Sequence, residues 1–69
     1  MEMIPVSSSN IDYVGYDSSS RELYISFHHG GTYVYFGVPE SVYNELMGAE
    51  SHGKYHAANI KHSYPYRRL

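Results

Sequence analysis

The sequence predicts a small α+β domain in which a three-stranded antiparallel meander packs with one or two short C-terminal helices. Two observations predict this class. Between residues 11 and 36, apolar and polar residues largely alternate, with the period of two that is typical of half-buried strands. After residue 38, apolar residues recur with helical spacing. A chain of 69 residues is long enough for one modest core, so we assign residues 1–69 to a single domain.

The first predicted strand covers residues 11–16. Strict alternation would place Ile11 and Tyr13 on one face and Val14 and Tyr16 on the other. The residues that follow, Asp17 and three serines, have side chains that hydrogen-bond to neighbouring backbone groups. They therefore predict a hairpin loop.

A second strand is predicted over residues 22–27, where large apolar residues alternate with mixed neighbours; its inner face consists of Leu23, Ile25 and Phe27. Gly30 and Gly31 follow, and two adjacent glycines tolerate the positive φ angles of a tight connection. We therefore expect a second hairpin at this point.

The third strand, residues 32–36, is rich in β-branched and aromatic residues. Val34 and Phe36 share one face, and Tyr33 and Tyr35 share the other, about 7 Å apart. We expect the Val34/Phe36 face to form the core, because it has no hydroxyl groups that need partners on burial.

A first helix is predicted to begin near Pro39, which suits the first helical position, and to end at Gly48. Its apolar stripe contains Val38, Val42 and Leu46. A second, marginal helix is predicted over residues 51–60, with Ser51 as its cap. Pro65 prevents its continuation, and residues 64–69 form a tail.

Composition excludes several classes of protein. The formal net charge is −2, too little positive charge for a general grip on a long polyanion. There is no cysteine, so neither disulfides nor thiolate zinc sites stabilise the chain. No apolar run is long enough for a signal peptide or a membrane span. We expect a soluble cytoplasmic protein that has no membrane partner.

Candidate catalytic and metal sites are weak. His52 and His56 are spaced to share one helix face, but no acidic residue or cysteine completes a known zinc motif, so we interpret them as solvated polar residues. We likewise assign His28 and His29 to a loop surface. No serine lies in a nucleophile elbow. We therefore predict a protein that is not an enzyme and has no metal or cofactor.

Positive charge and aromatic rings concentrate near the C-terminus. Four of the five Lys and Arg residues lie there, and no Asp or Glu follows Glu50. Arginine and lysine bind phosphate oxygens, and tyrosine rings provide faces on which bases stack. The candidate ligand-binding residues are Tyr33, Tyr35, Lys54, Asn59, Lys61, Tyr66, Arg67 and Arg68. The alternative is a basic tail that docks on the acidic sheet surface of its own or a neighbouring subunit.

Several separated segments carry a family resemblance: residues 4–11 (IPVSSSNI), 14–17 (VGYD), 33–39 (YVYFGVP), 59–60 (NI) and 64–66 (YPY). In this order they resemble the KTSC domain, which occurs alone in bacterial and phage proteins and at the C-terminus of some lysyl-tRNA synthetases. The family's Tyr-x-Tyr motif corresponds to Tyr33, Val34 and Tyr35. The resemblance implies a compact sheet-plus-helix module without known catalytic activity, for which a role in RNA binding is suggested.

Our leading hypothesis is a non-enzymatic nucleotide-binding module, in which Lys61, Arg67 and Arg68 contact phosphate and tyrosines stack on bases. It could sequester a small, even cyclic, nucleotide signal in a phage or bacterial context. The alternatives are a module that binds single-stranded RNA or tRNA, a protein-interaction module that uses its tyrosine face, and a nucleotide hydrolase. An acidic majority of the surface would repel a long RNA, which favours the small ligand.

We also expect a homo-oligomer. One three-stranded sheet with helices on one side leaves its other face open, and tyrosines on that face would be better buried against a second copy. Such a dimer or tetramer would place the ligand between subunits, with walls that include Tyr33, Tyr35, Lys61, Arg67 and Arg68.

Overall fold

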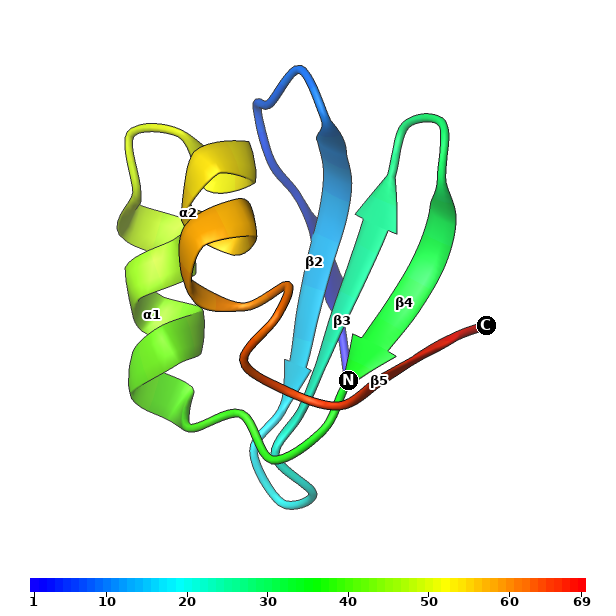
Figure 1. The fold of residues 1–69 in the computed structure, drawn as a ribbon, viewed down its shortest axis with the longest axis vertical. Coiled ribbons are helices and arrows are strands. Elements are labelled where there is room, and N and C mark those ends of the chain that lie inside the picture. Colours follow the sequence, from blue (N-terminus) through cyan, green and yellow to red (C-terminus); the bar gives the residue numbers. More distant parts are fainter.

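The protein has two layers, a sheet and a pair of helices that cover one face of it (Figure 1). A computed structural model describes all 69 residues. All neighbouring strands pair antiparallel, and their order across the sheet follows the chain. The elements are β1 (Met3–Pro5), β2 (Ile11–Asp17), β3 (Glu22–Phe27), β4 (Gly31–Tyr35), α1 (Glu40–Gly48), α2 (His52–Asn59) and β5 (Tyr66–Arg68).

The sheet has five strands, so the predicted three-stranded meander is correct for its centre but incomplete at both edges. β1 pairs with β2, and β5 pairs with β4. Each edge strand has three residues, too few to display a period of two. The predicted tail thus docks on the sheet of its own chain through backbone pairing, with the Val34 and Arg67 positions opposite each other.

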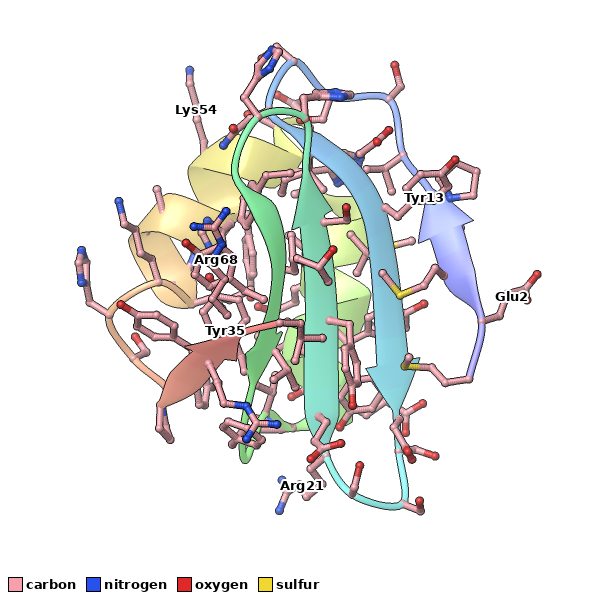
Figure 2. All side chains as sticks on the ribbon, turned by 90° about the vertical axis from the view of Figure 1, so that its right-hand side faces the viewer. Glu2, Tyr13, Arg21, Tyr35, Lys54 and Arg68 are labelled. Atoms are coloured by element: carbon pink, nitrogen blue, oxygen red, sulfur yellow. The ribbon has the colours of Figure 1, made fainter.

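The predicted facing of β2 is wrong at its start, because a register shift lies between Ile11 and Tyr13. A bulge of this kind inserts one residue and changes the alternation. As a result Ile11 and Val14 both lie in the core, while Tyr13 is exposed on the opposite face, beside Ser26 of β3. In Figure 2, Tyr13 and β1 lie towards one edge of the sheet and Arg68 lies towards the other.

The predicted core face of β4 is also wrong. Tyr35 belongs to the core cluster under the helices, and Phe36 lies outside the strand. The argument against buried hydroxyls fails here because His56 of α2 provides a hydrogen-bond partner for the Tyr35 hydroxyl. Val34 is buried as well, but on the open face, with Tyr24 and Arg67 on the strands beside it.

The turns and helices follow the predictions closely. Asp17 accepts hydrogen bonds from the Ser19 hydroxyl and from the backbone N–H groups of Ser19 and Ser20, which closes the β2–β3 turn. The pKa of Asp17 is lowered, chiefly by the Ser19 hydroxyl. Pro39 occupies the N-cap position of α1 rather than its first helical position, and the Ser51 hydroxyl caps α2 by accepting from the Lys54 N–H.

The core lies between the sheet and the helices, and eight buried residues form it: Ile11, Val14, Leu23, Ile25, Tyr35, Val38, Leu46 and Ile60. β2, β3 and β4 supply the sheet side. α1 supplies one fully buried side chain, Leu46. Neither helix is long and apolar enough to cross a membrane.

Gly31 is required by its backbone conformation. Its φ is +81°, and a Cβ there would lie 3.1 Å from the Arg68 guanidinium. We expect Gly31→Ala to lower the free energy of unfolding by about 1 kcal/mol or more, because a side chain is strained at positive φ. Gly48→Ala is the matched control, since a Cβ at Gly48 meets nothing within 4 Å. Urea denaturation of both variants tests this; equal stability would contradict it.

Candidate ligand-binding cavity

A cavity of about 490 Å³ lies beside the β3–β4 hairpin. Strands β4 and β5 form one wall, and α2 and the loop that follows it form the other. The residues that line it come from four separated parts of the chain. They are Asn10, Phe27, His29, Gly30, Tyr33, Tyr35, Gly53, His56, Ala57, Lys61, His62 and Tyr66. The pairing of β5 with β4 brings Tyr66 opposite Tyr35, which places the C-terminal segment along one wall.

Four aromatic residues surround the inner part of the cavity. The Phe27 ring meets the Tyr33 ring edge-on, with 5.8 Å between centroids. The centroid of the Tyr66 ring lies 5.7 Å from the ring centroids of both Tyr33 and Tyr35. These rings are on the helix-facing side of the sheet because β3, β4 and β5 present them in register. The arrangement provides apolar ring faces beside polar hydroxyl groups.

A buried hydrogen bond joins the sheet to α2 at this site. The Tyr35 hydroxyl lies 2.8 Å from His56 Nε2, and both residues are at least 95% buried. Burial, with smaller contributions from the positive charges of Lys61 and His62, lowers the pKa of His56 to about 4. Burial also raises the pKa of Tyr35 to about 12. Both groups are therefore neutral across the physiological pH range.

The cavity brings together four of the eight predicted ligand-binding residues: Tyr33, Tyr35, Lys61 and Tyr66. Arg68 lies at its edge. It is opposite Tyr33 in the β4–β5 register, and its guanidinium lies beside Gly31, next to the cavity-lining His29 and Gly30. We call Lys61 and Arg68 the basic rim.

The other predicted residues lie elsewhere. Arg67 faces the open side of the sheet, because side chains alternate along β5. The pKa of the Tyr24 hydroxyl, on that face, is raised chiefly by its hydrogen bond to Glu22. The positive charge of Arg67 acts on the same hydroxyl and lowers its pKa, in agreement with a position on the open face. Lys54 extends outward from α2 (Figure 2), and the Asn59 amide donates to the Tyr55 carbonyl.

The main functional candidate that the sequence interpretation missed is His56. We assigned it to a solvated helix face, but it is buried against Tyr35 and Phe27. Its partner in spacing, His52, contacts the Leu46 carbonyl through Nδ1. The structure contains no group of three or more His, Cys, Asp or Glu side chains arranged to hold a metal ion. Only the i, i+4 spacing of His56 and Ile60 could have indicated its inward position.

The lowered pKa of His56 predicts a loss of stability in mild acid. Its folded value is about 4, against 6.5 in the unfolded chain, so the unfolded state binds more protons between these values. The free energy of unfolding should therefore fall as the pH drops from 6.5 to 4, by up to about 1.4 kcal/mol per pH unit. The measurement is urea denaturation at several pH values. His56→Gln should remove this part of the slope, and an identical slope would contradict the assignment.

Comparison with known proteins places the chain in a family. The KTSC domain model matches residues 7–64. A protein of Tsukamurella paurometabola is 43% identical over 53 residues, which cover 77% of this chain and 79% of that protein. A lysine–tRNA ligase of Trichormus variabilis is 39% identical over 54 residues, but these make up only 10% of the ligase.

A solved structure agrees over almost the full length. The crystal structure of a KTSC domain protein from Yersinia pestis superposes with a TM-score of 0.97 at 41% sequence identity and covers 99% of this chain and 96% of that one. The matched segment of the family model contains both the Tyr33–Tyr35 motif and His56. On these grounds the chain belongs to the KTSC domain family.

Proposed function

We propose that the protein is a non-enzymatic module that binds a small nucleotide in the cavity between the β3–β4 hairpin and α2. The observation that carries the proposal is that aromatic rings and Lys61 line one cavity, with the Arg68 guanidinium beside Gly31 of the hairpin that borders it. In this proposal a base contacts the rings of Phe27, Tyr33 and Tyr66, and phosphate contacts Lys61 and Arg68.

The size and charge of the site favour a small ligand. A cavity of about 490 Å³ lies within the range typical of small-molecule sites, about 300–1,000 Å³. Two rim cations suit one or two phosphate groups, whereas a chain with net charge −2 offers little for a long polyanion. The bacterial relatives support a bacterial or phage setting, in which a small signalling nucleotide is a candidate ligand.

We propose binding without turnover because the cavity lining contains no carboxylate, serine or cysteine side chain. Histidines do line the cavity, but no carboxylate in the lining orients one of them as a base and no serine or cysteine is there for it to activate. Incubation with a bound nucleotide followed by chromatography checks this point. Recovery of intact nucleotide supports binding, and its conversion to product would overturn it.

The proposed function is tested by native mass spectrometry of the protein purified from cells without denaturation. We expect the protein to carry an added mass that is lost on acid denaturation. The molecule released should absorb near 260 nm, as nucleobases do. Calorimetric titration with the ligand identified from that mass then gives its affinity. Absence of a retained mass, together with absence of binding to a panel of mononucleotides and cyclic dinucleotides, would contradict the proposal.

RNA is a second candidate ligand, favoured by the similarity to a segment of a lysine–tRNA ligase. The two ligands differ in the salt dependence of binding, because each neutralised phosphate releases counterions. An RNA that contacts many phosphates would lose affinity steeply between 50 and 200 mM salt, and a nucleotide held by the two rim cations would lose it only slightly.

Self-association is a separate proposal, and its structural basis differs from the one predicted. Tyr33 and Tyr35 lie under the helices, so they do not form an open tyrosine face. One chain also forms the cavity alone. The open face instead carries a shallow apolar depression lined by Met1, Met3, Tyr13, Tyr24, Ser26, Thr32 and Leu69. Light scattering at micromolar concentration measures whether this face joins two copies; a monomeric mass would reject the proposal.

A further inference from the structure

His56 has one ring nitrogen that the protein leaves without a partner. Nε2 is paired with the Tyr35 hydroxyl, but Nδ1 makes no hydrogen bond with any protein group. Every fully enclosed polar side-chain atom in the structure has a partner, so Nδ1 is open to solvent. His56 lines the cavity and is only 5% exposed, and we therefore assign the exposed Nδ1 to the cavity side of the ring.

The nitrogen and the hydroxyl are coupled through the shared hydrogen bond. A neutral imidazole carries one ring proton. When the Tyr35 hydroxyl donates to Nε2, that proton resides on Nδ1, and the cavity faces an N–H donor. When Nε2 carries the proton and donates to the Tyr35 oxygen, Nδ1 presents a lone pair, and the tyrosine proton is free to donate to a ligand. The pair can therefore present either polarity without a change in charge.

From this arrangement we infer that Tyr35 and His56 form a neutral hydrogen-bonding pair that reads the polar edge of an uncharged ring, such as a nucleobase, where these two buried residues line the cavity. The inference rests on the proposed nucleotide-binding function and assigns the orientation of the ligand. The base enters first, towards α2, and the phosphate stays outside at the basic rim.

The chemistry of the Tyr35–His56 pair favours a neutral ring over phosphate. Placing a phosphate directly against two neutral, buried groups would remove its hydration without a charged group in contact with it, whereas Lys61, which is exposed, can meet it while it stays hydrated. A base edge instead offers adjacent hydrogen-bond donors and acceptors that match such a pair. Phe27 lies 5.1 Å from the His56 ring, and Tyr35 and Tyr66 lie 5.7 Å apart, so apolar surface is available for the rest of the base.

The test is calorimetric titration with AMP, GMP, CMP, UMP and ribose 5-phosphate, which has the phosphate and sugar but no base. We expect the wild-type protein to prefer some bases over others. Tyr35→Phe should weaken binding of the preferred nucleotide about tenfold and reduce the differences among bases, while binding of ribose 5-phosphate stays unchanged. Tyr24→Phe is the matched control: it removes a hydroxyl from the open face and should change nothing.

Imidazole ¹⁵N chemical shifts of His56 give a second readout. They are measured on the wild-type protein, so they do not require Tyr35→Phe to fold. They report which ring nitrogen carries the proton and should change when the preferred nucleotide binds. Nucleotides that bind with no difference among bases, or an unchanged preference in Tyr35→Phe, would overturn the inference and leave the proposed function intact. Failure of these nucleotides and of the cyclic dinucleotides to bind would overturn both.

Discussion

Replacing Leu46 with alanine is expected to lower the free energy of unfolding by about 2–5 kcal/mol. Leu46 is the one fully buried side chain of α1 and the one that belongs to the core cluster, against which Val42, Tyr43 and Met47 also pack. Truncation removes its apolar contacts and leaves a void that a short helix cannot fill. Domains of this size have total stabilities near the low end of about 5–15 kcal/mol, so the variant should be largely unfolded at moderate urea concentrations.

Asn44→Ala serves as the control, because Asn44 lies on the exposed side of the same helix. Its effect should stay within about 0.5 kcal/mol. Circular dichroism during urea denaturation measures both variants. A loss below 1 kcal/mol for Leu46→Ala would mean that α1 does not depend on this contact for its docking.

Replacing Arg68 with alanine is expected to weaken nucleotide binding about 10- to 100-fold, because a charge-assisted hydrogen bond to phosphate contributes about 1.5–3 kcal/mol. Arg68 lies on the cavity side of β5, beside the β3–β4 turn. Arg67→Ala is the matched control: it removes the same charge from the neighbouring residue, but on the open face. It should weaken binding less than threefold.

The comparison of the two arginine variants separates local contact from long-range attraction. If only net charge matters, both substitutions weaken binding equally, and the assigned rim position of Arg68 is wrong. If the ligand lies on the open face, Arg67→Ala has the larger effect. Affinities are measured by calorimetry at 150 mM salt, where charges more than about 8 Å apart are largely screened.

Much of the fold was predictable because its central elements carry strong local patterns. Leu23, Ile25 and Phe27 alternate as predicted, and Ser51 caps a helix as its side chain suggests. The edge strands were missed because β5 owes its strand geometry to pairing with β4, and its three residues are all exposed. No hydrophobic pattern marks a strand of this kind.

The errors in side-chain facing have specific physical causes. The bulge between Ile11 and Tyr13 is a register shift in the pairing with β3, which alternation along one strand does not reveal. The inward position of Tyr35 depends on His56, which is 21 residues away in the sequence. Each residue is an unfavourable choice for the core when it is considered alone, and each satisfies the other when both are buried.

The candidate site could be predicted only in part, because side-chain facing depends on strand pairing that the sequence does not reveal. Of the residues predicted to bind a ligand, Tyr33, Tyr35, Lys61 and Tyr66 line one cavity. Clustering of charge and rings in the sequence could not separate Arg67 from Arg68, because their facing depends on β5 being a strand. Lys54 and Asn59 are near the site in sequence, but both are exposed and neither lines the cavity.

The most direct test of the central claim, a nucleotide site between the β3–β4 hairpin and α2, is a ¹⁵N-resolved NMR titration of the full chain with each of the four nucleoside monophosphates in turn. We expect saturable shifts of the backbone amides of Tyr33, Tyr35, His56 and Lys61, with those of Tyr13 and Tyr24 on the open face unchanged. Shifts confined to the open face, or no saturable shifts with any nucleotide, would contradict the claim.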